Sequence, residues 1–222
     1  STFDILNEMF IRSKFHFGIA DERELAGKMI DAVAQDVYYK DEPQIWIFDR
    51  GFPSLSLIQK LLEHRLYFVM RVSSSFLKEV NAFRKSKYVD RVIHIEYSER
   101  RATQNHVHSD GISQFDLRCV RVKLPSGEDE ILVTNLDRKD FPKRDIKEIY
   151  RLRWGIETGF NYLKNAVFVE EFVSKTENGL AQDYFVSLLV YNFATCICGS
   201  MYPNIPKKEN TSTRSIEELP PD

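Results

Sequence analysis

The most constraining feature of this sequence is a strand–helix–strand pattern between residues 45 and 72. Residues 45–48 (IWIF) form a continuous apolar run, which is typical of a strand buried on both faces. Ser54 can cap the helix that follows, and residues 66–72 (LYFVMRV) form a second apolar run. Two strands joined by a helix over this length predict a parallel pair with a right-handed crossover.

An acidic residue, Asp49, directly follows the first strand of this pattern. Ligands of parallel α/β sheets gather at the carboxyl ends of the strands. Asp49 is therefore a candidate site residue.

The sequence on either side of this pattern predicts further elements. We expect one or two strands within residues 5–17, and a helix of about five turns that begins at the capping-box pattern of residues 21–24 and ends near Tyr39. Residues 74–137 change to short alternating segments, which predict a mainly antiparallel β insertion.

Two helices are predicted in the C-terminal part of the chain. The first is a long helix over about residues 144–164, and the second is an apolar helix over about residues 180–198. The longest apolar run, residues 184–198, is too short for a comfortable membrane span and contains Asn192. We therefore expect a buried helix there and no membrane partner.

Charge is distributed unevenly along the chain. The net charge of −2 and the pI near 6.2 are not those of a typical nucleic-acid binder. However, residues 1–49 carry five basic and ten acidic groups, whereas residues 138–153 carry seven basic and three acidic ones. A basic stripe beside an acidic region is compatible with a polyanion held against metal-binding carboxylates, and a solvated helix face is the alternative.

Cysteine usage and the N-terminal sequence bear on the compartment. The three cysteines (Cys119, Cys196 and Cys198) form no disulfide-like framework, which indicates a reducing interior. The first residues resemble no signal peptide. We therefore expect a cytoplasmic protein.

A cluster of charged and aromatic residues lies in the predicted long helix. On one continuous helix, Tyr150, Arg153, Glu157 and Lys164 share a face within about 60°, along a stripe roughly 21 Å long. Such a stripe can place the two cations on phosphates while Glu157 holds a metal ion. Simple i,i+4 pairing of Arg153 with Glu157 is the alternative. Gly155, with Gly159, suggests close approach by another group.

These residues resemble a known family. The spacing Tyr-(2)-Arg-(3)-Glu-(6)-Lys is similar to the signature of the insertion-sequence transposases of family four, which are cut-and-paste enzymes with an RNase H-like fold. The segment IWIFDRGF (residues 45–52) resembles the region around the second catalytic aspartate of that family, and residues 21–26 resemble the helix start before it. The resemblance covers about residues 1–200 and includes the β insertion.

The resemblance implies a mechanism and a set of partners. Asp49 and Glu157 would be two of three carboxylates that bind two Mg²⁺ (or Mn²⁺) ions about 4 Å apart. Tyr150, Arg153 and Lys164 would grip the backbone of the transposon end. The implied partners are double-stranded DNA, as terminal inverted repeats and target, and a second subunit in a DNA-dependent homodimer. The implied location is the bacterial cytoplasm, in association with the nucleoid.

The expected fold class is α/β, an RNase H-like core with a mixed sheet interrupted by the β insertion. The expected organisation is a first part of the core (residues 1–73), the insertion (74–143), a C-terminal helical part with the motif (144–200), and a disordered tail (201–222). The first catalytic aspartate of the family would precede residue 1, because the context of Asp4 resembles a later strand. Asp4 stays open as an alternative ligand. If it is not one, the chain is an N-terminally truncated transposase with two of the three ligands, and we then expect it to bind Mg²⁺ poorly and not to cut DNA.

Two other functions stay open. A non-catalytic DNA-binding remnant would keep the fold and the basic stripe without the full active site. An RNase H-like nuclease or resolvase is the other possibility, although Tyr150 and Lys164 at the family spacing argue against it. Arg50 and Trp154 are candidate secondary contacts, and the residue pair His106 and His108 is more simply explained as incidental than as a metal site.

Overall fold

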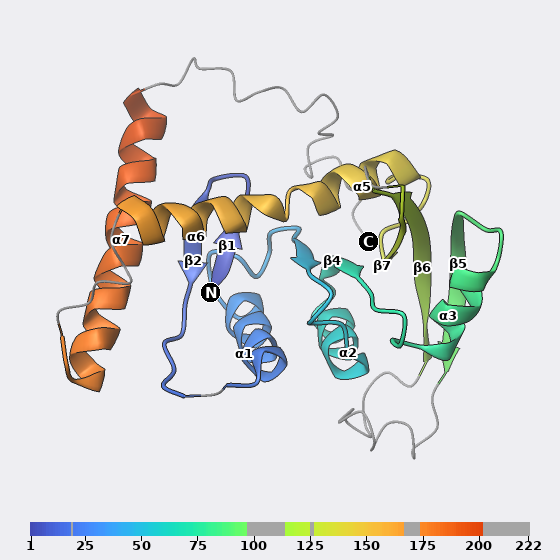
Figure 1. Ribbon diagram of the computed structural model, residues 1–222, viewed down its shortest axis with the longest axis horizontal. Coiled ribbons are helices and arrows are strands. Elements are labelled where there is room, and N and C mark those ends of the chain that lie inside the picture. The colour runs from blue at the N-terminus through green and yellow to red at the C-terminus, as the bar shows by residue number, and fades with distance from the viewer. Residues whose placement is uncertain (19, 97–113, 125–126, 167–173, 202–222) are drawn as a thin grey trace. The chain divides into compact units, whose positions relative to one another are not determined.

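The computed structural model describes residues 1–18, 20–96, 114–124, 127–166 and 174–201 (Figure 1). The described chain forms two compact units. One contains residues 1–21 and 152–201, and the other contains residues 22–151. The predicted disordered tail and the pair of histidines at 106 and 108 lie outside the described residues, apart from residue 201 at the end of a helix.

The unit of residues 22–151 is built on a mixed five-stranded sheet with the strand order β3-β4-β7-β6-β5. Its first pair is parallel, and the remaining pairs are antiparallel. This confirms the parallel pair and the α/β fold class with a mixed sheet. The strands are β3 (Ile45–Phe48), β4 (Tyr67–Arg71), β5 (Asp90–Glu96), β6 (Gln114–Lys123) and β7 (Asp129–Thr134).

Helices cover both faces of this sheet. On one face, α1 (Glu22–Ala34), α2 (Leu55–Glu63) and α3 (Lys78–Lys85) bury a core with Phe68 and Met70 of β4. On the other face, α5 (Lys143–Arg151) buries Ile146 against Val69. Because successive side chains of a strand point to opposite faces, residues 68 and 70 serve one core and residue 69 the other.

Local contacts explain where helix α2 begins and where helix α1 ends. The Ser54 side chain caps α2 by accepting a hydrogen bond from the Leu57 N–H at 3.2 Å, as predicted. The prediction that the preceding helix continues to Tyr39 is wrong, because α1 ends at Ala34. Beyond it, the Asp36 side chain accepts the Tyr38 N–H at 3.0 Å, in a local turn that competes with the helix.

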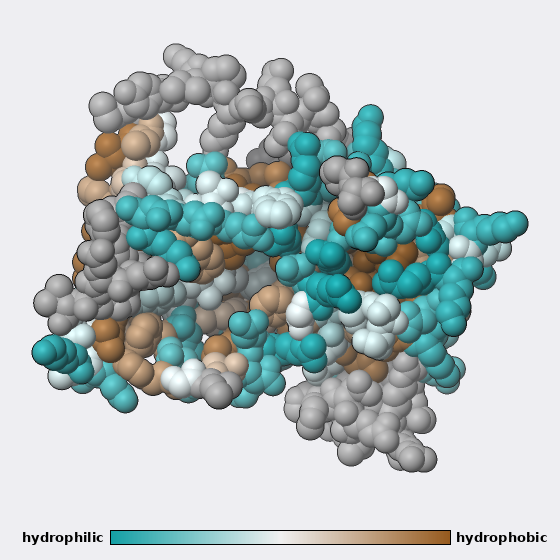
Figure 2. All heavy atoms as spheres, viewed as in Figure 1, coloured by the Kyte–Doolittle hydropathy of each residue, from teal (hydrophilic) through white to brown (hydrophobic). Residues whose placement is uncertain are grey.

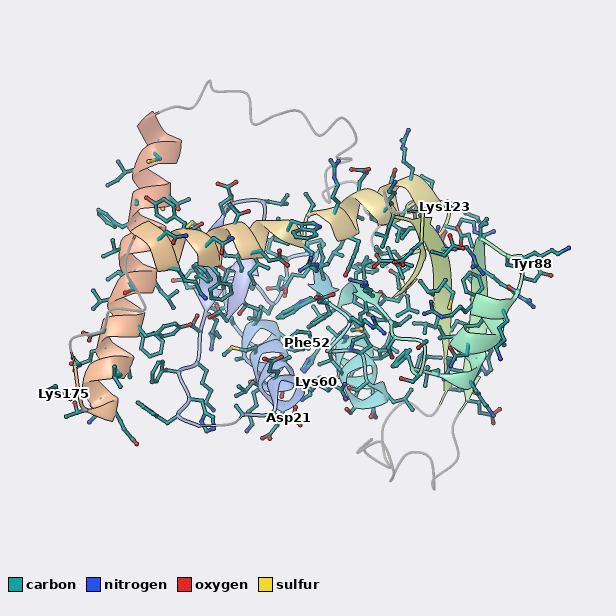
Figure 3. All side chains as sticks on the ribbon, viewed as in Figure 1. Asp21, Phe52, Lys60, Tyr88, Lys123 and Lys175 are labelled. Carbon is teal, nitrogen blue, oxygen red and sulfur yellow. The ribbon has the colours of Figure 1, made fainter. Side chains whose placement is uncertain are left out.

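An ion pair joins α1 to α2. The Lys60 ammonium of α2 contacts both carboxylate oxygens of Asp31 in α1, at 2.7 and 2.6 Å (Figure 3). His64 also lies 2.9 Å from the same carboxylate. Burial raises the pKa of Asp31, but the hydrogen bonds from Lys60 and His64 outweigh it, so the pKa lies below its usual value.

Two further differences from the predictions have simple causes. The expectation that residues 45–48 contact a core on both faces is confirmed, because Trp46 and Phe48 pack on one cluster and Ile45 on the other, but residues 45–47 are only partly buried. The reason is that β3 is the terminal strand in the order of the described sheet. Helix α3 was not predicted, because it has only eight residues and only two of them, Val80 and Phe83, are buried, so the i,i+3 pattern is too short to stand out.

The other unit combines a hairpin with two helices. Strands β1 (Thr2–Asp4) and β2 (Met9–Arg12) are antiparallel, and the core contains Phe10 together with Leu163 of α6 (Trp154–Ala166) and Leu188 and Tyr191 of α7 (Glu177–Met201). The two strands confirm the expected N-terminal strands, although the first lies ahead of residue 5.

Asn192, the polar residue in the apolar run, has a structural role within this unit. Its side chain accepts the Phe10 N–H at 2.8 Å and donates to the Phe10 carbonyl at 2.7 Å. It thereby satisfies both backbone groups of a buried strand residue, as buried polar groups require. No helix in the described part of the chain is long and apolar enough to cross a membrane. The expectation of a buried helix is wrong for most of the run, because Leu188 and Tyr191 are buried but several large apolar side chains of α7 are exposed: Phe185, Val186, Leu189, Val190, Phe193 and Ile197.

The two helical glycines lie against the hairpin of this unit. A Cβ atom on Gly159 would lie 3.0 Å from the ring of Phe3, and one on Gly155 would lie 3.2 Å from Ile5. The close approach that the sequence suggested therefore occurs. Within the described structure, the approaching groups are side chains of this chain.

Candidate active site

Asp49 lies at the carboxyl end of β3, as the sequence predicted. Its Oδ1 atom accepts the Arg50 N–H at 2.7 Å and the Tyr150 hydroxyl at 3.2 Å. The side chain is 45% exposed, so solvent and ligands can reach the carboxylate. The structure thus brings together two predicted site residues that are 101 positions apart in the sequence.

The packing of α5 positions Tyr150. Tyr150 is partly buried on the same apolar cluster as Ile146 and Ile149 of its helix and Val69 of β4. This cluster holds the helix on the sheet, and the phenol ring reaches the end of β3 with its hydroxyl. Apolar packing of the Tyr150 ring therefore positions its hydroxyl for the hydrogen bond to Asp49.

Two charged residues beside Asp49 were missed from the sequence. Arg71, the last residue of β4, forms an ion pair through Nη2 with Glu130 of β7, and its Nη1 lies 3.9 Å from Asp49 Oδ1. The Glu130 side chain is only 9% exposed and that of Arg71 is 32% exposed. The guanidinium therefore links a buried carboxylate to the exposed one.

Strand register brings these residues together. Phe48 pairs with Met70, so Asp49 follows β3 where Arg71 ends β4. Arg71 pairs with Leu132 of β7, and Glu130 lies two residues away on the same face of that strand. The available signal was a charge at the end of an apolar strand, but its partner could not be identified without the pairing of β4 and β7.

The other motif residues lie in the other unit. Glu157 is in the first turn of α6, with its side chain 44% exposed, and it forms an ion pair with Arg153 Nη1 at 2.5 Å. The Arg153 guanidinium also lies 4.7 Å from the centre of the Trp154 ring. The i,i+4 pairing considered from the sequence is therefore present. Lys164 is exposed near the end of α6.

The prediction of one continuous helix through the motif is wrong. Helix α5 ends at Arg151 and α6 begins at Trp154, with a turn in which the Gly155 N–H bonds the Leu152 carbonyl at 2.8 Å. Tyr150 therefore does not share one helix face with Arg153, Glu157 and Lys164, because the calculation assumed a single helix. It does apply within α6, where Glu157 and Lys164 are seven residues apart and share a face.

Asp4 has a local structural role. Its Oδ1 atom accepts the N–H groups of Leu6 and Asn7, each at 3.0 Å, and its Oδ2 atom accepts the Asn7 side-chain amide at 2.6 Å. These bonds close the turn between β1 and β2, as aspartate commonly does.

The donor chemistry of Asp49 and Glu157 suits a hard divalent cation. Both are partly exposed carboxylates, and oxygen ligands are preferred by Mg²⁺ and Mn²⁺. The described residues contain no group of three acidic, histidine or cysteine side chains that could hold a metal ion together. Burial, with a smaller contribution from Asp90, raises the pKa of the Cys119 thiol to about 12, which makes a thiolate ligand there unfavourable.

Residues 1–193 match the family model described as "Transposase DDE domain". This range includes both sequence motifs, around Asp49 and from Tyr150 to Lys164.

Relatives with transposase names match most of the chain. "Probable transposase for insertion sequence element IS5377" of Geobacillus stearothermophilus is 22% identical over 180 residues, which are 78% of this chain and 43% of that protein. "Putative transposase y4zB" of Sinorhizobium fredii is 26% identical over 149 residues, which are 66% of this chain and 40% of that protein. A third, named in the same terms for element IS4SA of Synechocystis, is 22% identical over 182 residues, or 79% and 46%.

The aligned part of this chain spans less than half the length of these relatives. The family match confirms the DDE transposase resemblance, while the narrower assignment to family four stays a prediction. Because the match extends over residues 1–193 of 222, the chain belongs to the transposase DDE domain family.

Proposed function

We propose that this chain is the catalytic domain, or part of it, of an insertion-sequence transposase that cleaves and joins DNA phosphodiesters by two-metal DDE chemistry. The observation that carries this proposal is the hydrogen bond from Tyr150 to Asp49 at the carboxyl end of β3. A residue expected to contact DNA thereby touches a residue expected to hold metal. Family membership supports the same reaction class.

Asp49 and Glu157 are the proposed catalytic and metal-binding residues. When bound, Mg²⁺ or Mn²⁺ supplies Lewis-acid activation of a water or 3′-hydroxyl and stabilisation of the leaving oxygen. The chain contributes carboxylate oxygens that solvent can reach. The hydrogen bonds to Oδ1 of Asp49 from Arg50 and Tyr150 orient that carboxylate before any ligand arrives.

Tyr150, Arg153 and Lys164 are the proposed contacts to the DNA backbone. Arg153 is paired with Glu157 in the protein alone, and a phosphate would compete with Glu157 for the guanidinium. Such an exchange would free the carboxylate for a cation as DNA arrives. Lys164, on the same face of α6 as Glu157, would provide a second phosphate contact.

The proposed partners are double-stranded DNA, as terminal inverted repeats and target, and a second subunit in a DNA-dependent homodimer. We propose the bacterial cytoplasm, with nucleoid association, as the location. The proposed organisation keeps residues 1–73 and 144–200 as parts of an RNase H-like core and residues 74–143 as the β insertion. The strands of that insertion share one sheet with β3 and β4.

A single-turnover cleavage assay tests this function. This chain and a version extended at its N-terminus to include a first catalytic aspartate are incubated with a duplex that carries the neighbouring inverted repeat, in Mg²⁺, Mn²⁺ or EDTA. We expect divalent-dependent cleavage by the extended version, and its loss in Asp49→Asn and in Glu157→Gln. Asp41→Asn, which changes an exposed carboxylate outside the proposed site, is the matched control.

The assay also separates the alternative functions. DNA binding without cleavage by either version would indicate a non-catalytic DNA-binding remnant. Cleavage that does not depend on the repeat sequence would indicate a nuclease. Cleavage that persists in Glu157→Gln would contradict the assigned active site.

A further inference from the structure

Helix α5 has two chemically distinct faces. Ile146 is fully buried, and Ile149 and Tyr150 pack beside it on the sheet. The solvent side carries four exposed cations, which we call the cationic face of α5: Lys143, Arg144, Lys147 and Arg151. In the view of Figure 2, hydrophilic side chains predominate where α5 lies in Figure 1.

The acidic residues of α5 do not cancel this face at the surface. Asp145 pairs with Arg144, but its side chain is 16% exposed, against 76% for the arginine. Glu148 pairs with Arg151 and is 35% exposed, against 57% for that arginine. The carboxylates therefore lie toward the protein, and the guanidinium groups project toward solvent.

Helix stability does not account for the placement of the first two of these cations. Lys143 and Arg144 occupy the first turn of α5, where the helix dipole disfavours positive charge by about 0.3–1 kcal/mol per residue. A helix selected only for stability would carry acidic residues at these positions. The arrangement instead suits a polyanion outside the helix.

The spacing also suits a phosphate backbone. Lys143, Lys147 and Arg151 recur every four residues, so they form a row with steps of about 6 Å along the helix. DNA presents phosphates at about 3.4 Å of axial rise per strand, so one step of the row corresponds to roughly every second phosphate, and cations placed along the backbone gain affinity by releasing counterions. The row ends beside Tyr150, whose hydroxyl contacts Asp49.

We propose that the cationic face of α5 binds the sugar–phosphate backbone of duplex DNA and holds the duplex alongside Asp49. The occupant is DNA because the face combines outward positive charge with a regular axial spacing. This inference rests on the proposed function. It adds a sequence-independent docking surface to the three proposed motif contacts.

The test is the salt dependence of DNA binding without metal. Affinity for a fluorescent 30-base-pair duplex is measured by anisotropy in EDTA between 50 and 200 mM KCl. The triple variant Lys143→Gln/Lys147→Gln/Arg151→Gln is expected to bind at least about 10-fold more weakly at 100 mM KCl. Its slope of log affinity against log salt should be smaller in magnitude by about 2–3 than that of the unmodified protein.

The matched control removes the same number of charges elsewhere on the same unit. Lys28→Gln/Lys40→Gln/Lys78→Gln changes three exposed lysines on or near α1 and α3. We expect this variant to keep most of the slope, and thermal melting checks that both variants fold. Equal slopes for the α5 variant and the unmodified protein would overturn the proposal, as would equal losses in the two triple variants.

Competition experiments distinguish DNA from an acidic protein as the partner, and cleavage assays distinguish this proposal from the proposed catalysis. If polyglutamate of matched charge displaces the duplex as well as unlabelled DNA does, an acidic protein is the better partner and the proposal is overturned. Asp49→Asn is expected to keep the full salt slope while losing cleavage. A reduced slope in the α5 variant, without any cleavage by the N-terminally extended chain, would support the docking surface and contradict the proposed catalysis.

Discussion

The Tyr150 hydroxyl donates a hydrogen bond to Asp49 Oδ1 over 3.2 Å and joins α5 to the carboxyl end of β3. Tyr150 belongs to the apolar cluster beneath α5, so its position is set by packing as well as by this bond. The orientation of the proposed catalytic carboxylate therefore depends on how α5 sits on the sheet. This dependence leads to the first prediction.

Tyr150→Phe keeps the ring in the apolar cluster and removes the donor to Asp49. A hydrogen bond of this kind contributes about 1–2 kcal/mol, so we expect the single-turnover cleavage rate to fall about 5- to 30-fold with a small change in melting temperature. Tyr38→Phe, at an exposed tyrosine, is the control. An unchanged rate in Tyr150→Phe would show that this contact does not orient the carboxylate.

Arg71→Met should destabilise the fold, because it leaves the buried Glu130 carboxylate without its ion-pair partner. Breaking a buried pair costs about 3–5 kcal/mol, and partial exposure of Arg71 lowers our expectation to about 2 kcal/mol. Urea unfolding measures the change. Arg71→Met/Glu130→Gln should recover most of the loss, and failure to recover any of it would assign the effect to packing of the arginine.

Stability should depend on Asp90 at neutral pH more than in acid. Burial raises the pKa of Asp90, but hydrogen bonds from Arg118 and Arg138 outweigh it, and the pKa lies below its usual value. A depressed carboxyl pKa stabilises the fold above the unfolded-state value of about 3.9, and this contribution is lost as pH falls through the folded-state value.

The measurement for Asp90 is urea unfolding of the wild-type protein and Asp90→Asn at several pH values. The difference in unfolding free energy is expected to be largest near pH 7 and to shrink below about pH 4 as the wild-type carboxyl protonates. Asp116→Asn, at an exposed carboxylate, is the control. A difference that stays constant from pH 7 to pH 3 would contradict the assigned ion pair.

Gly159→Ala should destabilise the unit of residues 1–21 and 152–201, even though alanine favours helices. The new Cβ would lie 3.0 Å from the Phe3 ring, which is held in edge contact with Phe10 at a centroid distance of 4.8 Å. We expect a net loss of about 1 kcal/mol after the helix-propensity gain of about 1 kcal/mol. The control Gly199→Ala has open space around the new atom and should be neutral or stabilising. Thermal melting of both variants decides the sign.

Sequence patterns predicted the features that depend on neighbouring residues. The strand at residues 45–48, the Ser54 cap and the parallel partner β4 follow from local apolar patterns and capping chemistry. Asp49 could be placed at a strand end for the same reason. Such features require no knowledge of which distant segments meet.

Features that depend on tertiary register could not be predicted. The Arg71–Glu130 pair requires the pairing of β4 with β7, and no local pattern encodes that partner. The break between Arg151 and Trp154 was hidden because apolar and charged residues keep a helical period across it. The low helix propensity of glycine at position 155 was the one local sign of that break.

The central proposal, which rests on the family resemblance of both motifs, is that Asp49 and Glu157 hold the same divalent cations. Its most direct test is oxidative cleavage of the polypeptide by Fe²⁺ with ascorbate and peroxide, using the N-terminally extended chain. Because hydroxyl radicals cut close to the bound iron, we predict backbone cuts near residues 49 and 157 that Mg²⁺ suppresses and Asp49→Asn abolishes together. Cuts at one position only, or cuts that survive in Asp49→Asn, would contradict a shared metal site.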